Sequence, residues 1–270
     1  MSKLFGRVAS VTVDTTKVDG LRIAFKVEQN PSKEPDTLEL SIYNLTKDTR
    51  ANMSKARARV ELSAGYTDTQ DVIFRGDLRR AYTVAEGPDR ITKIFCGDGE
   101  VAFRTSRINK TYKPGHDIIK MIKDMAGTLG VDTKDAIDKI GQGTFRGGLT
   151  QLFKGKSVSG SAADALDEML KGLGYQYSIQ DGQLVVVPKN EATDHEAVLL
   201  SPTTGLLGSP EAGEDGKISI LALLQPRLKP FRKLKLDSLS LKGFYRIEKA
   251  THTGDTHGAP WQTQIEARTL

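Results

Sequence analysis

Short runs in which apolar and polar residues alternate dominate the first hundred positions. Alternation with a period of two predicts half-buried β-strands, here at residues 7–13, 21–27 and 37–43. Thr46 has the position of an N-cap, so we expect a short helix that ends at Met53. Closely spaced strands with Gly and Pro between them are typical of an all-β barrel or sandwich, and further strands are predicted at residues 59–64, 71–78 and 90–96.

The middle of the chain changes to helical spacing. Residues 116–129 and 161–173 each carry an apolar stripe with a period near 3.6, after the candidate caps Asp117 and Ser161. Both stripes end at a Leu-Gly pair, which hints at a repeated helix–strand unit. Asp181-Gly182 stands between two alternating runs and predicts a hairpin. Residues 141–148 are rich in glycine, and we expect a loop there that orders on assembly.

The last third returns to strand patterns, around a polar loop expected at residues 209–216. The predicted fold class is therefore α+β, mainly β, with two small β barrels flanking a small α/β insert. The predicted domains are residues 1–104 for the first barrel, 105–195 for the insert and 196–270 for the second barrel. The strands expected in the second barrel are residues 197–200, 218–224, 233–241, 243–252 and 262–267.

Composition is that of an ordinary folded chain. The 270 residues are 38% hydrophobic and 27% charged, which permits normal cores. No run of roughly 18 apolar residues occurs, so no membrane contact is expected. The first seven residues lack an apolar signal core, so we expect the chain to stay in the host cytoplasm until lysis. The single cysteine, Cys96, follows Ile94-Phe95 and is interpreted as a buried inert thiol rather than a nucleophile.

The net charge of +5 permits contact with nucleic acid or with acidic protein surfaces, and favours neither. Spread over several segments and accompanied by only 6% aromatic residues, the basic residues fit interface or solvated faces better than a nucleic-acid site. The basic clusters are Lys55-Arg57-Arg59, Arg79-Arg80, Arg104-Arg107-Lys110-Lys113 and Arg227-Lys229-Arg232-Lys233-Lys235.

No catalytic residues are predicted. Asp98 with Glu100, and Asp167 with Glu168, are neighbours in sequence without a constellation around them, and solvation is the default. Lys154-Gly155-Lys156-Ser157 lacks the upstream glycine spacing and the buried strand of a phosphate-binding loop. No cofactor is expected.

The block between His252 and Trp261 leaves two interpretations open at each site. His252, Asp255 and His257 offer donors that suit zinc or another transition ion. However, Gly254 and Gly258 flank a tight turn, in which Asp255 would bond local backbone groups, and we favour this turn over a metal site. Trp261, the only tryptophan, is expected to anchor a barrel end rather than to stack on a ligand.

The same block carries a family resemblance. His252, then Gly254-Asp255-Thr256 and Trp261, preceded by the Ser201–Pro210 run, resembles the baseplate hub proteins of phages with long contractile tails, the Mu-like and late-control-type hubs. The stretches at residues 20–25 and 37–45 are similar to the first barrel of that family. The resemblance spans most of the chain and is weakest across residues 105–160.

The resemblance implies a structural hub in the virion, not an enzyme. Three copies would form a homotrimeric ring that adapts the hexameric tail tube to the trimeric central spike. The implied partners are the tail tube or tube-initiator protein and the central spike protein, with the tape-measure protein and baseplate wedge as further candidates. An oligonucleotide-binding protein with basic small-barrel domains is the alternative, and a carbohydrate-active enzyme has no acid pair to support it.

Overall fold

The computed structural model describes residues 4–31, 35–53, 58–99, 105–133, 136, 155–213 and 215–270. The chain forms two compact units. Unit 1 combines Met1–Asn30, Asp36–Asp98 and Asn190–Leu270, and unit 2 combines Pro31–Pro35 with Gly99–Lys189. The chain therefore leaves unit 1 after its first third and returns to it for its last third. The division into three domains at 1–104, 105–195 and 196–270 stays a prediction.

The first part of unit 1 is a set of antiparallel strands whose side chains alternate between the core and solvent. In the third strand, for example, Ile23, Phe25 and Val27 are buried while Lys26 is exposed. Thr46 caps the short helix by accepting a hydrogen bond from the backbone N–H of Thr49 (3.2 Å), as expected. The elements are β1 (Arg7–Val13), β2 (Thr16–Val18), β3 (Ile23–Gln29), β4 (Thr37–Tyr43), α1 (Lys47–Met53), β5 (Arg59–Tyr66), β6 (Asp71–Glu86) and β7 (Asp89–Gly97).

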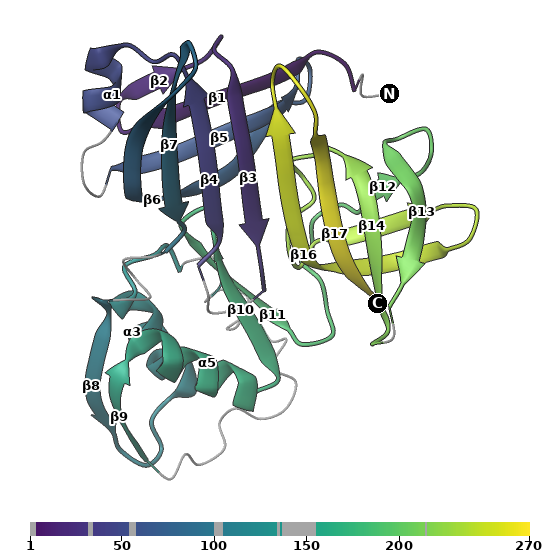
Figure 1. Ribbon diagram of the computed structural model, residues 1–270. Helices are drawn as coiled ribbons and strands as arrows, with labels where there is room; N and C mark the ends of the chain where they lie inside the picture. The colour runs from purple at the N-terminus through teal and green to yellow at the C-terminus, as the bar shows by residue number, and fades with distance from the viewer. Residues whose placement is uncertain are drawn as a thin grey trace. The chain divides into compact units, whose positions relative to one another are not determined.

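The last third of the chain adds six strands to the same sheet. The result is one 13-stranded sheet with the path β13-β14-β17-β16-β3-β4-β7-β6-β5-β1-β2. Off this path, β15 pairs with β16, and β12 pairs with β15. Figure 1 shows β16 lying beside β3, where the two parts of unit 1 meet. The added strands are β12 (Val198–Leu200), β13 (Leu206–Ala212), β14 (Lys217–Leu223), β15 (Lys233–Asp237), β16 (Lys242–Asp255) and β17 (Trp261–Thr269).

Unit 1 contains an internal repeat of five strands. In sequence, strand repeat 1 runs β3, β4, β5, β6, β7, and strand repeat 2 runs β13, β14, β15, β16, β17. In space, repeat 1 has the order β3-β4-β7-β6-β5 and repeat 2 has the order β13-β14-β17-β16-β15, with every neighbouring pair antiparallel. The two repeats therefore share one topology, although their sequences do not reveal it.

The register of the two repeats also agrees. The pairing of β6 with β7 shifts between Leu78 and Arg80, and that of β16 with β17 shifts between Ile247 and Lys249. With these two bulges aligned, Thr83 on β6 corresponds to His252 on β16. Both side chains make the same cross-strand contact: Thr83 Oγ1 lies 3.2 Å from Thr92 Oγ1, and His252 Nδ1 lies 2.9 Å from Thr263 Oγ1.

Two hydrophobic clusters fill unit 1. The first cluster is built from β1 to β7, but Leu224 and Trp261 from the last third also belong to it. The second cluster lies among β12 to β17, with Ile220, Ile247 and Ile265 fully buried. Among the described residues no strand pair closes either part into a barrel, so the two-barrel detail stays a prediction, while the mainly β composition is confirmed.

Unit 2 is a small α+β unit with its own hydrophobic cluster. Asp117 caps the first helix by accepting from the Ile119 N–H (2.9 Å), and Ser161 caps the second by accepting from the Asp164 N–H (3.3 Å), as expected. Asp181 (φ 56°) and Gly182 (φ 79°) form the predicted hairpin turn. The elements are β8 (Arg107–Tyr112), α3 (Ile118–Thr128), β9 (Lys156–Ser161), α5 (Ala162–Gly172), β10 (Tyr175–Gln180) and β11 (Gln183–Pro188).

Several features differ from expectation. β15 ends at Asp237, short of the predicted end at residue 241, and β2 was not predicted. Residues 209–212 belong to β13, so the predicted polar loop at 209–216 is wrong in its first half. β6 continues through Glu86, well beyond the predicted end at Leu78. The antiparallel pairing of β8 with β9 was not predicted. The glycine-rich segment 141–148 lies outside the described residues.

Candidate interaction surfaces

The candidate metal ligands His252, Asp255 and His257 do not converge on one point. The ring of His252 is fully buried and contacts Thr263, as described above. The carboxylate of Asp255 accepts hydrogen bonds from Arg22 (Nη2 to Oδ2, 2.7 Å) and from the His257 backbone N–H (2.9 Å). Among the described residues no group of three His, Cys, Asp or Glu side chains could hold a metal ion. Asp255 thus bonds a local backbone group in the β16–β17 turn, the arrangement we favoured.

Burial and charge shift the pKa values of this block in predictable directions. Burial, with a smaller contribution from the positive charge of Lys229, lowers the pKa of His252 to about 3. The hydrogen bond from Arg22 holds the pKa of Asp255 below its ordinary value. The Arg22 guanidinium also lies 4.4 Å from the ring centroid of Tyr43. Arg22, which sequence patterns did not single out, therefore ties the β16–β17 turn to the first part of unit 1.

Trp261 lies in the core where the two parts of unit 1 meet. It packs edge-on against Phe25 (5.6 Å between centroids) and Tyr66 (6.5 Å), and Arg7 lies 5.8 Å from its ring. Gly254 makes this packing possible, because a Cβ there would lie 2.5 Å from Phe25 Cζ and 2.8 Å from Trp261 Cε3. The Trp261 side chain therefore packs between strands in the core and has a structural role.

The remaining candidates for chemistry are placed in structural roles. Cys96 is buried, and burial raises its pKa to about 12. Asp167 pairs with Lys171 (2.8 Å), and Glu168 pairs with Lys156 (2.7 Å). Asp98 is buried, whereas Glu100 and Lys154 lie outside the described residues.

The basic clusters are dispersed. Lys110 is paired with Asp124 (2.5 Å) in unit 2, and Lys229 is buried in unit 1. The Lys235 Nζ lies 5.8 Å from the ring centroid of Phe244.

None of the described helices is long and apolar enough to span a bilayer.

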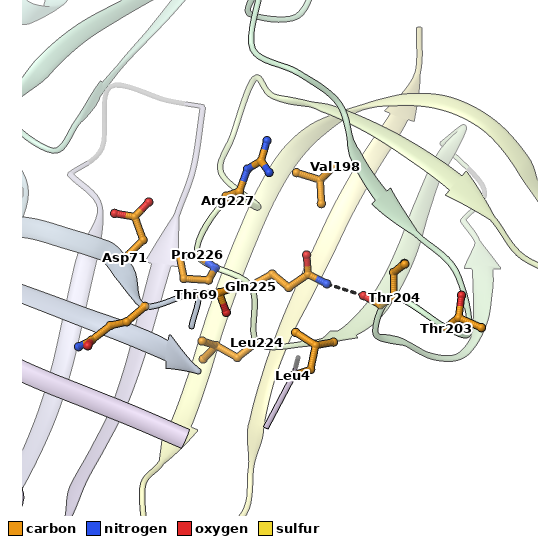
Figure 2. Close-up of a pocket in the computed structure, with 11 residues that line it drawn as sticks. Leu4, Thr69, Asp71, Val198, Thr203, Thr204, Leu224, Gln225, Pro226 and Arg227 are labelled. Atoms are coloured by element: carbon orange, nitrogen blue, oxygen red, sulfur yellow. Dashed lines mark hydrogen bonds between the residues drawn. The ribbon is translucent and has the colours of Figure 1, made fainter. Parts of the chain in front are cut away.

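A cavity of about 430 Å³ opens in unit 1 between segments that are far apart in sequence. The Gln225 amide donates to the Thr204 carbonyl (2.7 Å) across it, as Figure 2 shows. Leu4 and Leu224 supply apolar walls, so the cavity combines hydrogen-bonding groups with apolar surface. Such a lining suits a partner's side chain or a small ligand. The cavity is lined by Leu4, Thr69, Gln70, Asp71, Val198, Thr203, Thr204, Leu224, Gln225, Pro226 and Arg227.

A shallow groove of about 330 Å³ crosses the outer face of the sheet over β16, β3, β4, β7 and β6. At its β6 side Tyr82 stacks on Phe95, with 6.0 Å between centroids and 11° between the planes. The Arg80 guanidinium lies 5.0 Å and 4.8 Å from these two rings. Sequence reasoning missed this cluster because it ended the strand at Leu78.

Several strand edges of unit 1 carry no partner among the described residues, including the outer edges of β2 and β12, and two of these edges belong to the strand repeats. β13 ends the sheet, and only β14 pairs with it. β6 pairs with β5 through Asp77, so beyond Leu78 it has β7 on one side alone. Unpaired edges of this kind are sites for strand addition.

Comparisons with known proteins give one consistent picture. A family model described as "Baseplate hub gp41" matches residues 9–267, while no curated protein sequence matches the chain. A 43 kDa tail protein of prophage MuSo2 from Shewanella oneidensis superposes with a TM-score of 0.66 at 8% identity, covering 98% of both chains. A tail protein from Neisseria meningitidis gives 0.68 at 10% identity, covering 97% of this chain and 96% of that chain.

A third similar structure comes from a secretion system. The E. coli c3393 protein, described as a component of the type VI secretion system with similarity to T4 tail proteins gp27 and gp5, gives a TM-score of 0.61 at 8% identity. The match covers 96% of this chain and 76% of that one. At these identities the likeness concerns the fold.

Proposed function

The chain belongs to the baseplate hub gp41 family, and from this membership we propose that three copies form a ring that adapts the hexameric tail tube to the trimeric central spike. The family is one of structural tail proteins, so the chain is a structural component of the phage tail baseplate and not an enzyme. The ring and the adaptor role are the proposal, and they go beyond family membership.

The internal repeat is the observation that supports this proposal. Each chain presents two copies of one five-strand topology with the same register. Three chains would then present six similar units, which matches the six-fold symmetry of a tube, while the ring as a whole keeps the three-fold symmetry of a spike. Closed rings satisfy every subunit contact, whereas open head-to-tail contacts leave two ends exposed.

The proposal includes finer features. Each strand repeat would lie within a small barrel, with unit 2 as the insert between the two barrels. The partners would be the tail tube or tube-initiator protein on one side and the spike protein on the other, with the tape-measure protein and baseplate wedge nearby. Assembly would take place in the host cytoplasm, and the product would remain in the virion.

The mass of the purified full-length chain tests the ring. We expect light scattering to give three times the chain mass of 29.5 kDa, either for the chain alone or after co-expression with the spike gene from its own gene neighbourhood. Electron-microscopy class averages of that particle should show a ring with three-fold symmetry. A monomer or dimer under both conditions would contradict the proposal.

One feature favours the alternative function, oligonucleotide binding. Arg80 lies against Tyr82 and Phe95 on the outer groove, and a cation beside stacked rings is a common way to hold single-stranded bases. This function predicts binding of a fluorescent single-stranded oligonucleotide that weakens steeply with added salt. A monomer with such binding, lost in Arg80→Ala, would replace the proposed ring and adaptor role by this alternative.

A further inference from the structure

The two strand repeats share a topology but differ in what covers them. The distal half of β16, residues 250–255, pairs with β3 on its second edge. The distal half of β6, residues 81–86, is its counterpart when the bulges are aligned, and no described strand pairs with its second edge. The chain therefore contains one complete joint between repeats and one half of a second joint.

Equivalent residues of the two repeats also differ in burial. On β16, Ala250 and His252 are fully buried and Asp255 is 7% exposed. Their counterparts on β6 are Ala81, Thr83 and Glu86, of which Ala81 is half-buried and the other two are exposed. Positions with the same place in the fold thus differ in exposure where repeat 2 has a neighbouring strand and repeat 1 has none.

β13, which ends the sheet path in repeat 2, is equivalent to the strand that is missing beside β6. β3 supplies the joint inside the chain, and β13 occupies the place of β3 in repeat 2. The outer edge of β13 is unpaired among the described residues. Val27 on β3 is fully buried, whereas Ala212, which corresponds to it on β13, is exposed. Within the two strand repeats, each chain thus has one strand edge to offer and one to fill, among the described residues.

We propose that β13 of one copy pairs antiparallel with the distal half of β6 of the next copy, repeating between chains the joint that β3 and β16 form within the chain. This inference rests on the proposed ring and adds the strands and the register that close it. The contact is head-to-tail, so it generates a ring or an open filament and not a two-fold dimer.

The register follows from the joint inside the chain. There Val27 pairs with His252 and Lys26 pairs with Thr253. When β3 and β16 are replaced by their equivalents β13 and β6, Ala212 lies opposite Thr83, and Glu211 lies opposite Val84, in the joint between chains. The second pair places Glu211 on the face that carries Arg80, because Arg80 packs on Tyr82 and side chains on a strand alternate between faces.

Charge supports this pairing. β13 has the sequence LLGSPEA, with one carboxylate and no basic residue. Arg80 is exposed on β6, and the half-buried Lys93 pairs with Tyr82 from β7. Residues 81–86 themselves carry Glu86 and no basic residue, but Glu211 would approach the face of the sheet that carries Arg80 and Lys93. This attraction favours β13 over another copy of β6, which would bring a second Arg80 instead of a carboxylate.

The irregularity of β13 limits the contact to short segments. Its pairing with β14 shifts between Leu207 and Glu211, so three residues stand opposite one. Pro210, inside this bulge, has no N–H to donate. Bulges and prolines protect exposed edges from unselective pairing, so a short edge that accepts only a matching partner is consistent with a chain that stays separate before assembly.

A disulfide tests the register directly. The full chain carrying Val84→Cys and Glu211→Cys should cross-link under mild oxidation, since directly opposed residues of antiparallel strands lie within disulfide range. On a non-reducing gel we expect linked dimers and trimers and no larger species. Each single variant alone should stay unlinked, because a head-to-tail contact does not bring identical positions together. Cys96 is retained in every variant, as it is buried.

The matched control is Thr83→Cys with Glu211→Cys. This pair is one residue out of register and points to opposite faces, so its yield should be at least about tenfold lower. A trimer by light scattering without a Val84–Glu211 link would overturn the strand joint and leave the ring standing. Links that continue beyond three copies would support the joint and contradict the ring. A monomer without links would overturn both.

Discussion

The buried imidazole of His252 makes the stability of unit 1 depend on pH. In the folded chain its pKa is about 3, against an ordinary value of 6.5. The unfolded chain therefore binds a proton below pH 6.5 that the folded chain does not bind. By linkage, the free energy of unfolding must fall as the pH falls from about 6.5 toward 3, and it is fully retained above 6.5.

The size of the effect follows from the two pKa values. Between pH 7 and pH 5, protonation of His252 shifts the folding equilibrium toward the unfolded chain by more than a factor of ten. This lowers the free energy of unfolding by about 2 kcal/mol. The carboxylates with lowered pKa, such as Asp255 and Glu28, have ordinary values of 3.8 and 4.5. Their contributions are lost mainly at lower pH, so the window from 7 to 5 isolates the imidazole.

Urea unfolding at pH 7, 6 and 5 measures this dependence. In His252→Asn the amide can still contact Thr263 but does not titrate, so its stability should change by about 2 kcal/mol less than that of the parent between pH 7 and pH 5. The test compares how much the free energy of unfolding changes between pH 7 and pH 5 in each chain, so a lower absolute stability of the variant does not affect it. His257→Asn, which removes the exposed histidine of the β16–β17 turn, is the control. Equal pH dependence in His252→Asn and the parent would refute the linkage.

Two further predictions concern the core of unit 1. Gly254→Ala should cost about 1–3 kcal/mol of stability in urea unfolding, because the new methyl group meets Phe25 and Trp261. Gly258→Ala, whose Cβ would lie 3.4 Å from Asp255 Oδ2, should cost less. Equal costs for the two variants would contradict this packing. Cys96 should resist a thiol-specific reagent in the native chain at pH 8 and react fully in urea, because its pKa is near 12 and it is buried; rapid native labelling would show that the strand opens.

Local patterns predicted those elements that bury one regular face. Alternation identified β1 and β4 with their observed bounds, because each strand has a buried face and a partly exposed face. The caps Asp117 and Ser161 marked the starts of α3 and α5 correctly. In each case the signal and the structure depend on the same few residues, so sequence reasoning was sufficient.

Strands without a regularly alternating buried face gave no such signal. β8 and β9 read RINKTY and KSVSGS, with too few apolar residues to alternate. The distal half of β6 is mostly exposed, which is why its end was placed at Leu78. β13 contains Gly208 and Pro210, both ordinarily signs of a loop. Backbone hydrogen bonds hold these strands, and such bonds leave little trace in residue type.

The interaction surfaces were harder to foresee than the elements. Arg22 and Asp255 are separated by more than two hundred positions, and only the pairing of β16 with β3 brings them together. The repeat in the strands was not foreseen, since the Leu-Gly pairs hinted at a repeat only in the helical middle. A repeat of this kind preserves strand order and bulge position, and both are visible only once the pairing is known.

The contrast between the two joints explains why one topology carries two kinds of sequence. The joint within the chain forms during folding, so it can bury His252 and fix Asp255 with Arg22 without exposing them first. An edge that awaits a second copy must stay in water beforehand, and a buried-type strand there would invite aggregation. Thr83 and Glu86, which are exposed on β6, meet this demand, and Pro210 on β13 offers no N–H to an unselective partner. Where the proposed joint forms, its lower apolar content would make it weaker than the joint inside the chain, so the ring should separate into folded chains before either repeat unfolds.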